Sequence, residues 1–246
     1  MQTGQRVEAL VFDVFGTVVD WRTSITEEVM AVAAAKQAPS TRSGWHQGDW
    51  PKFADEWRRG YHDGMKRVNA GEWPWMVVDQ IHRRKLDELL PKYGLGALNE
   101  SERDHLNRAW RRLKPWPDAV QGLTRLKKRY VIAPLSNGNL ALLTNMAKHA
   151  GLPWDCVLSS ELAGRYKPDP RAYQKAADLL GLATDRVMMV AAHVSDLRGA
   201  QSAGLRAAFV TRPMEFGPDG KPDMEPDASF DVSAKDFFDL ASHMGA

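Results

Sequence analysis

Short apolar runs alternate with helix-length amphipathic segments along much of the chain. Five of these runs end in turn residues and are rich in β-branched side chains, which favours buried strands over helices: "VEALVFD", "VIAPLSNG", "DCVLSS", "VMMVAAH" and "AAFVTRP". Amphipathic segments separate the later runs: "NLALLTNMAKHAG", "DPRAYQKAADLLGL" and "DLRGAQSAGL". This alternation predicts an α/β fold with a doubly wound, Rossmann-like parallel sheet.

The pattern changes between Trp21 and about Pro115, where apolar positions recur with helical spacing. One such helical face is marked by Val78, Ile81, Leu86, Leu89 and Leu90. Within the same stretch, "NESE" is typical of a helix start and "PWP" of a stop. We therefore predict that residues 1-20 and 116-246 form the sheet domain, and that an all-helical domain, residues 21-115, is inserted after the first strand.

Two local features of composition bear on the fold, and the first of them leaves two interpretations open. Eight of the nine tryptophans fall within residues 21–116, where they fill the core of the helical domain or line a pocket that faces the sheet. The segment "RPMEFGPDGKPDMEPD" is rich in proline and glycine, which predicts a surface loop near the end of the chain.

Charge and cysteine content narrow the classes of partner. The chain carries 33 basic and 31 acidic residues without a basic stripe, so we expect no nucleic-acid partner. Cys156 is the single cysteine, which excludes an internal disulfide and fits a reducing compartment. The N-terminus lacks the apolar run of a signal peptide, and no run approaches the roughly 18 apolar residues of a membrane span. We expect a cytoplasmic protein that does not associate with membranes.

Polar side chains follow the ends of four predicted strands: Asp13, then Ser136 and Asn137, then Lys167, and finally His193 with Asp196. Each has an ordinary structural interpretation, as a turn residue, a helix cap or a core histidine. In open parallel sheets, however, ligands bind beyond the carboxyl ends of the strands. Because all these side chains belong to that one edge, we expect them to converge on a site.

The same residues carry a family resemblance that covers nearly the whole chain. In order, "DVFGT", "SNG", "YKPD" and the strand-to-helix turn with Asp196 resemble the motifs of the haloacid dehalogenase superfamily. The helical insert is similar to the cap domain of that superfamily. The resemblance implies that Asp13 is a nucleophile that forms a covalent ester, that Ser136 or Asn137 binds substrate, and that Lys167 steadies the carboxylates.

Two departures separate the chain from the phosphatases of this superfamily. Their first motif resembles "DxDGT", in which the second Asp protonates the leaving alcohol, but Phe15 stands here and has no proton to give. Their fourth motif resembles "GDxxxD", in which the first Asp helps to hold Mg²⁺, and here that position is Ala192. The remaining carboxylates, Asp13 and Asp196, make a poor magnesium cage beside a lysine. We therefore predict no metal and no cofactor.

The branch that the chain resembles instead is the metal-independent L-2-haloacid dehalogenases. Their third motif is similar to "YKPDPRAY", which ends at Tyr173, and their cap arginine follows a tryptophan, as Arg58 does here. Arg59 stands beside Arg58 and leaves the choice between them open. Their fourth motif resembles "SSNxxD", but in this chain alanines and His193 replace the hydroxyl and the amide.

This resemblance implies a hydrolase that acts on carbon–halide bonds and converts short 2-haloacids to 2-hydroxyacids. Asp13 attacks the carbon in line, forms an ester and releases the halide to Arg58. The other candidates for binding substrate or halide are Phe15, Thr17, Ser136, Asn137 and Tyr173. Backbone amides near Thr17 or Ser136 are expected to bind the substrate carboxylate. Relatives of this branch are often dimers, which favours a homodimer.

In the second half of the reaction, water attacks the ester and a general base takes its proton. A neutral His193 imidazole suits this work near neutral pH, with Asp196 orienting it or acting as the base in its place. Water and halide are therefore the other small partners of the site.

The large side chains expected near the site predict a small substrate. The "SGWHQGD" segment carries Trp45 and His46, which crowd the pocket and add donors to the halide if the segment folds over it. Such a pocket favours haloacetates and extends the expected substrates to fluoroacetate. The alternative is that this segment only connects two cap helices and lies in solvent.

Two other functions remain as alternatives, a phosphatase-like hydrolase of the same superfamily and a non-catalytic binding protein on its fold. Phe15 and Ala192 weigh against the phosphatase. Retention of Asp13, Lys167 and Asp196 weighs against loss of catalysis.

Overall fold

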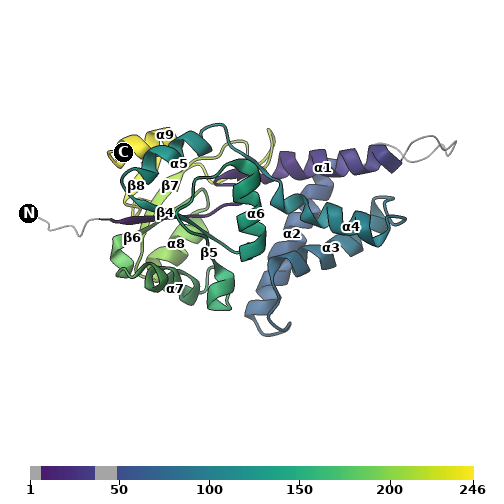
Figure 1. The fold of residues 1–246 in the computed structure, drawn as a ribbon, viewed down its shortest axis with the longest axis horizontal. Helices are drawn as coiled ribbons and strands as arrows, with labels where there is room; N and C mark the ends of the chain where they lie inside the picture. The colour runs from purple at the N-terminus through teal and green to yellow at the C-terminus, as the bar shows by residue number, and fades with distance from the viewer. Residues whose placement is uncertain (1–6, 37–48) are drawn as a thin grey trace, which may run out of the picture.

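The computed structural model describes residues 7–36 and 49–246. Its centre is a six-stranded parallel sheet with the strand order β5-β4-β1-β6-β7-β8, drawn at one end of an elongated molecule in Figure 1. The strands are β1 (Ala9–Phe12), β4 (Val131–Ser136), β5 (Leu158–Ser159), β6 (Val187–Ala191), β7 (Arg206–Val210) and β8 (Val232–Ala234). The predicted α/β class is confirmed. Only β8 was missed within this sheet, because its three residues are too few to show a pattern.

β1 lies in the middle of the sheet, and its four residues are completely buried. Because side chains alternate along a strand, Ala9 and Val11 face one apolar cluster while Leu10 and Phe12 face the other. Residues of α7 (Pro170–Leu180) and α8 (Val194–Ser202) belong to the first cluster. The second contains residues of α5 (Ala119–Lys127), α6 (Leu140–Ala150) and α9 (Phe237–His243). Helices on both faces explain the continuous apolar runs of the strands.

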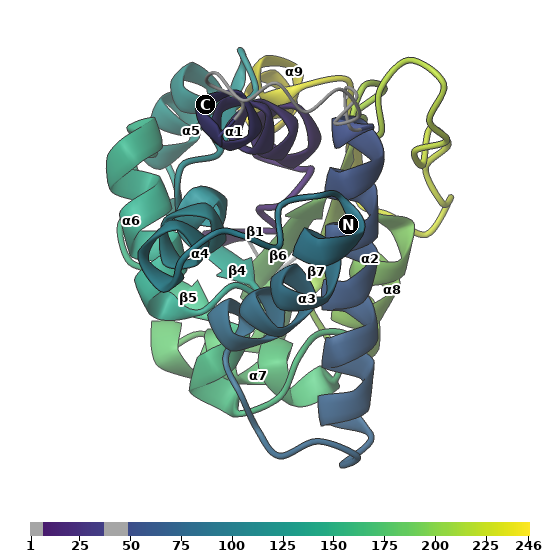
Figure 2. The ribbon, with the colours of Figure 1, turned by 90° about the vertical axis from the view of Figure 1, so that its right-hand side faces the viewer.

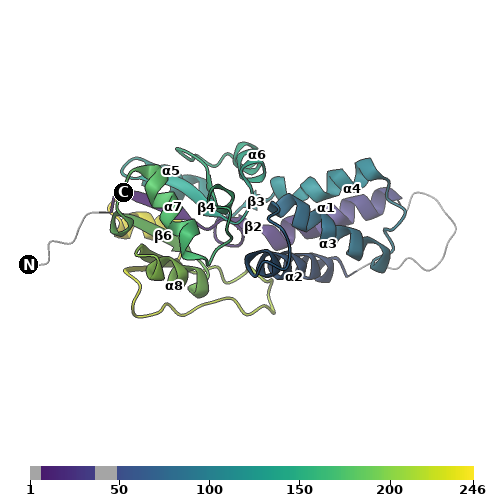
Figure 3. The same cartoon turned by 90° about the horizontal axis from the view of Figure 1, so that it is seen from below.

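A helical cap lies beyond the carboxyl ends of the strands (Figures 1 and 3). Its helices are α1 (Trp21–Lys36), α2 (Trp50–Asn69), α3 (Val78–Lys92) and α4 (Glu100–Asn107). The chain leaves and re-enters the core through an antiparallel ribbon of β2 (Val19–Asp20) and β3 (Lys114–Pro115). The domain limits 1-20, 21-115 and 116-246 remain predictions. Short 3-10 helices are η1 (Arg108–Arg111), η2 (Ser160–Ala163) and η3 (Thr184–Arg186).

Within the two described ranges, none of the helices is both long enough and apolar enough to cross a membrane.

α2 forms because its sequence contains a start signal followed by helical apolar spacing. The Asp49 side chain accepts a hydrogen bond from the Lys52 amide, and Pro51 occupies the first turn, where no intrahelical amide bond is lost. Its buried positions recur every three or four residues and include Phe53, Ala54, Trp57, Tyr61, Met65 and Val68. That face packs against α1 and α3, and Figure 2 shows α2 beside α3 when the cap faces the viewer.

Three tryptophans among the described residues of the cap are core residues. Trp21, Trp57 and Trp110 are at most 1% exposed. Trp57 packs edge-on against Trp110, and Trp110 stacks on His82 with ring centroids 4.2 Å apart. The ring of Phe15, from the core, packs edge-on against Trp110 and so joins the two parts of the molecule.

The turn after β1 explains the glycine of the "DVFGT" motif. Gly16 has a φ of +91°, a conformation that other residues rarely adopt. A Cβ atom at this position would also lie 2.1 Å from the Oε1 atom of Glu215. Gly16 therefore provides both the backbone turn and the space for a carboxylate from a distant segment.

That distant segment departs from its prediction at two positions. "RPMEFGPDGKPDMEPD" lies mostly on the surface, as expected, but Arg212 is 6% and Glu215 1% exposed. The Arg212 guanidinium donates two hydrogen bonds to Asp118 and a third, from Nε, to the carbonyl of Thr17. The Glu215 amide in turn donates to the carbonyl of Arg212. These hydrogen bonds hold the start of the loop against the carboxyl edge of the sheet.

We predict that Gly16→Ala destabilises the protein by more than Gly71→Ala does. Gly71 has a φ of +76° but no atom within 4 Å of an added Cβ, so its substitution costs only the backbone strain of about 1–2 kcal/mol. Gly16→Ala adds the collision with Glu215. Chemical denaturation of both variants measures the difference, and equal losses would show that Glu215 moves aside freely.

Candidate active site

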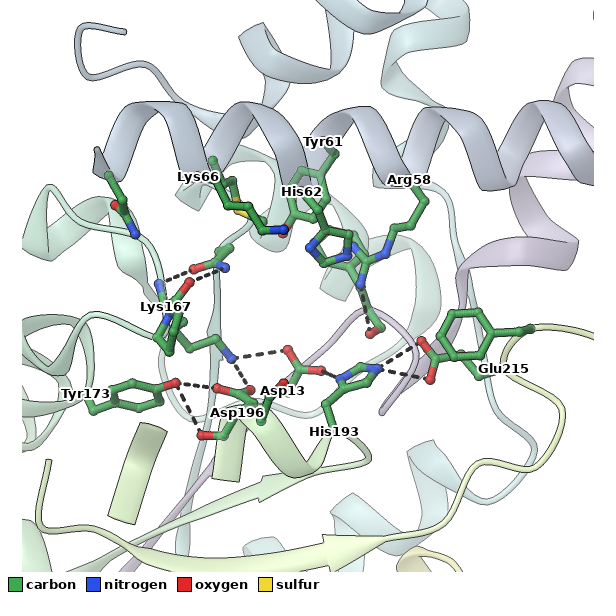
Figure 4. Close-up of a pocket in the computed structure, with 17 residues that line it drawn as sticks. Asp13, Arg58, Tyr61, His62, Lys66, Lys167, Tyr173, His193, Asp196 and Glu215 are labelled. Carbon is green, nitrogen blue, oxygen red and sulfur yellow. Dashed lines mark hydrogen bonds and ion pairs between the residues drawn. The ribbon is translucent and has the colours of Figure 1, made fainter. Parts of the chain in front are cut away.

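A cavity of about 340 Å³ lies between α2 and the carboxyl ends of the strands (Figure 4). One face of α2 forms its upper wall, with the residues Arg58, Tyr61, His62, Met65, Lys66 and Asn69 spaced three or four apart along the helix. The opposite wall comes from segments that follow β1, β4, β5, β6 and β7. The predicted convergence of polar groups at this edge is therefore observed.

Asp13 is the central carboxylate of the cavity floor. Its Oδ1 atom accepts a hydrogen bond from Lys167 Nζ at 3.2 Å, and its Oδ2 atom accepts one from the Thr17 hydroxyl at 2.9 Å. His193 Nδ1 lies 3.0 Å from Oδ2. Burial favours protonation, but the charges of Lys167 and His193 outweigh it and hold the pKa of Asp13 far below its usual range. The carboxylate is thus ionised and aligned by donors.

Lys167 joins Asp13 to a second carboxylate. Its Nζ atom lies 2.6 Å from Asp196 Oδ2, and Tyr173 donates its hydroxyl to Asp196 Oδ1 at 2.6 Å. Burial would lower the pKa of Lys167, but Asp196 and Asp13 together raise it, so the ammonium stays charged. Burial raises the pKa of Asp196, and the charge of Asp13 adds to this effect while Lys167 opposes it.

His193 differs in charge from the neutral base that the sequence predicted. Its Nδ1 atom faces Asp13, and its Nε2 atom lies 3.0 Å from both carboxylate oxygens of Glu215. Burial would lower the pKa of the imidazole, but the charge of Glu215 and the hydrogen bond to Asp13 raise it to about 10. In this arrangement His193 is therefore an imidazolium near neutral pH, because two carboxylates flank the ring.

Arg58 is a buried cation with an unused hydrogen-bond donor. Its guanidinium lies 4.9 Å from the ring centre of Tyr61, 5.2 Å from that of Phe15 and 5.4 Å from that of Trp21. Nη2 makes one long hydrogen bond, 3.5 Å, to the Phe15 carbonyl, and the buried Nη1 has no partner among the described residues. An unpaired donor on a buried charge is costly, so the pocket is suited to an anion at this position. Arg59, the alternative, is exposed.

Asn137 positions the loop that carries Lys167. Its side chain accepts a hydrogen bond from the Lys167 amide at 2.7 Å and donates one to the Lys167 carbonyl at 3.3 Å, and it lines the cavity. Ser136 is completely buried behind the wall, where its hydroxyl accepts a bond from the Gly138 amide. Thr17 is also buried and supports Asp13 directly.

Ala192 stands where the phosphatases carry a metal-binding aspartate. It contributes only its backbone to the site, and its amide donates a hydrogen bond to Thr17 Oγ1. Within residues 7–36 and 49–246, no group of three or more His, Cys, Asp or Glu side chains is arranged to hold a metal ion. The absence of a metal stays a prediction.

The predicted crowding of the pocket has no support in the described residues. Trp45 and His46 lie outside them. A cavity of about 340 Å³ is larger than a two-carbon acid requires. Its volume therefore does not select haloacetates by itself.

Sequence reasoning missed Glu215 and the further α2 residues of the wall. Tyr61, His62 and Lys66 follow Arg58 at helical intervals, so the helical period was a usable signal for them. Glu215 follows "AAFVTRPM", and the rule that strand ends share an edge applied to that strand too. The proline and glycine content of the loop predicted a surface position for Glu215 instead.

Three comparisons place this geometry among known proteins. A protein-family model described as a haloacid dehalogenase-like hydrolase matches residues 7–204. The (S)-2-haloacid dehalogenase 4A of Burkholderia cepacia is 31% identical over 209 residues, which are 84% of this chain and 84% of that protein.

Two solved structures resemble the whole chain. A defluorinating L-2-haloacid dehalogenase is 45% identical with a TM-score of 0.92, over 99% of this chain and 97% of that one. Another L-2-haloacid dehalogenase is 42% identical with a TM-score of 0.87, over 97% and 99%.

The fold and the site thus define a capped α/β protein with an ionised aspartate at the end of its central strand. The chain belongs to the haloacid dehalogenase-like hydrolase family.

We predict that Arg58→Lys weakens bromide binding about 10- to 100-fold, since a hydrogen bond to a charged group is worth about 1.5–3 kcal/mol. Lysine keeps the charge but loses the planar donor that sits among the rings. Isothermal titration calorimetry measures the affinity, with Arg59→Lys as the matched control on the exposed side of the same turn. An equal loss in both variants would contradict an anion site at Arg58.

Proposed function

We propose that this protein is a metal-independent hydrolytic dehalogenase that converts short 2-haloacids to 2-hydroxyacids through an ester of Asp13. One observation carries the proposal: the ionised Asp13 and the guanidinium of Arg58 line opposite walls of the same cavity (Figure 4), and Arg58 holds a buried N–H without a partner among the described residues. A nucleophile and an acceptor for a departing anion are thus placed on opposite walls. The (S)- and L-2-haloacid dehalogenases that the chain resembles support the same substrate class.

In the first step, an Asp13 oxygen attacks the carbon that bears the halogen. The carbon–oxygen bond forms as the carbon–halogen bond breaks, and the halide leaves with the electron pair toward Arg58. The low pKa of Asp13 keeps the attacking oxygen unprotonated, and fixed positions supply a high effective concentration. The hydroxyl of Tyr61, whose pKa burial raises to about 12, stays protonated beside Arg58 as a second donor.

In the second step, water attacks the carbonyl carbon of the ester. Of the two bases that the sequence left open, we assign the proton to Asp196. Its raised pKa suits it to accept a proton, and it lines the cavity beside Lys167. His193 is already charged in the resting enzyme and is the weaker candidate for the base.

The phosphatase-like alternative needs a proton donor where Phe15 stands. That ring is 2% exposed and packs against Tyr61 and Trp110. No proton can come from that position, and Ala192 offers no carboxylate. We therefore retain phosphatase activity only as an outcome of the test below.

Three further parts of the proposal rest on the sequence and the family resemblance. We propose that residues 21–115 act as the cap that closes the cavity over the core. We also propose a homodimer and a cytoplasmic location.

We predict that a single turnover in ¹⁸O-water, with enzyme in excess, labels Asp13 and leaves the hydroxyacid unlabelled. The product's hydroxyl oxygen comes from the old Asp13 carboxylate, because water attacks the ester carbonyl. Peptide mass spectrometry locates the label, with the Asp196 peptide as the internal control. Label in the product hydroxyl would mean that water attacks the substrate carbon directly.

We predict halide release from chloroacetate, bromoacetate and L-2-chloropropionate with EDTA present, and no hydrolysis of an aryl phosphate. Metal-dependent phosphate release without halide release would establish the alternative.

Fluoroacetate belongs to the same panel, because Arg58 and Tyr61 offer donors where charge develops on a poor leaving group. The name of the 45% identical neighbour, a defluorinating enzyme, supports this extension. Absence of fluoride release would remove only the extension to fluoroacetate.

A further inference from the structure

We propose that the His193 imidazolium, fixed by Glu215, stabilises the oxyanion that forms when water attacks the Asp13 ester. Glu215 is then a positioning residue that acts through His193. This inference rests on the proposed function, because it requires the ester.

The two oxygens of Asp13 have different surroundings, which assigns their roles. Lys167 and His193 approach the carboxylate from opposite sides (Figure 4). Oδ1 has a single partner, Lys167 Nζ, whereas Oδ2 lies between the Thr17 hydroxyl and His193 Nδ1. Oδ1 is therefore the freer oxygen for attack on carbon, and Oδ2 becomes the carbonyl oxygen of the ester. Two donors are already in place where negative charge will develop.

The contacts of Glu215 require both imidazole nitrogens to carry hydrogen. Nε2 lies 3.0 Å from each Glu215 oxygen, while Nδ1 lies 3.0 Å from Asp13. A neutral ring has one N–H and would direct a lone pair at one of these carboxylates, whereas the imidazolium donates to both. Glu215 is 1% exposed and otherwise receives only the Trp21 indole N–H at 3.1 Å among its side-chain contacts in the described residues. The charged ring thus also compensates a buried carboxylate.

Ester formation removes the charge of Asp13 but leaves that of Glu215. The pKa of His193 then falls below its resting value of about 10, while the charge of Glu215 continues to favour the imidazolium. The ring therefore remains a donor to Oδ2 during the second step. With Asp13 as its only carboxylate partner, the ring would lose this support as soon as the ester forms.

The proposed step balances as follows. The water oxygen bonds to the ester carbonyl carbon, the carbonyl electron pair moves to Oδ2, and the water proton goes to Asp196. His193 and Thr17 donate to the oxyanion. The electron pair on Oδ2 then re-forms the carbonyl bond, and the bond between the Asp13 carbonyl carbon and Oδ1 breaks. The hydroxyacid leaves as an alkoxide that contains Oδ1, and it takes the proton from Asp196. Asp13 is left as a carboxylic acid that carries the second proton of the water. Because its neighbours hold its pKa far below the usual range, it releases this proton to solvent and is restored as a carboxylate.

A neutral His193 base and a charged His193 donor predict opposite effects of the isosteric variant Glu215→Gln. Removal of the Glu215 charge lowers the pKa of His193. A donor then loses activity as pH rises through the lowered value, whereas a base gains activity at low pH. The charged and titratable groups that share the cavity with His193 are Asp13, Arg58, Tyr61, His62, Lys66, Lys167, Tyr173, Asp196 and Glu215.

The experiment is quench-flow of chloroacetate turnover by wild type, Glu215→Gln and the control Glu225→Gln, from about pH 6 to 9. Glu225 lies exposed on the same loop, so its variant carries the same charge change away from the cavity. We expect a burst of one halide per site in all three proteins. Ester hydrolysis in Glu215→Gln falls with rising pH and is slower by about 10²–10³-fold at the upper end, as for loss of an oxyanion donor. Wild type and Glu225→Gln lose far less over this range.

Hydrolysis in Glu215→Gln that is unchanged, or faster near pH 6, would overturn the inference. Absence of any halide release from wild type would instead overturn the proposed function.

A second measurement needs no substrate. ¹⁵N NMR of the imidazoles, with His193→Asn to assign the signal, should show His193 protonated to near pH 10 in wild type and Glu225→Gln. In Glu215→Gln the midpoint should fall by more than one pH unit. A wild-type midpoint near the ordinary 6.5 would overturn the inference even if haloacids are cleaved.

Discussion

The charge of one buried carboxylate organises this molecule. Asp13 ends the central strand, where a bare charge would be costly to bury, so opposite charges and donors must reach it from other segments. Lys167 arrives after β5 and His193 after β6. Each of these cations needs a further carboxylate in turn, and Asp196 and Glu215 supply them. The result is a line of alternating charges across the sheet edge, in which each residue fixes its neighbour.

Most of the fold and much of this line could be predicted from the sequence. β1 is buried on both faces, so its apolar run was a clear signal, and parallel strands place their carboxyl ends together. From that rule we predicted that Asp13, Lys167 and His193 lie close together, as they do in the structure. It works because the polar groups follow strands that are themselves easy to recognise.

The rest depends on contacts between distant residues. The entry of Glu215 into the site follows from the pairing of Arg212 with Asp118, 94 residues away, which no local pattern reveals. The charge of His193 could not be predicted either, because it depends on Glu215. The burial of Arg58 and the exposure of Arg59 depend likewise on how α2 turns its face toward the core.

Gly16 and Glu215 share one small volume, although about 200 residues separate them in the sequence. Their evolutionary histories are therefore coupled. In a descendant with a larger residue in place of the glycine, the acid must shift, shorten or be lost, and the histidine then loses its second carboxylate from its present position. A descendant that first loses the acid has space for a side chain at the turn. In a lineage of such proteins, the glycine, the acid and the histidine should be gained and lost as one unit.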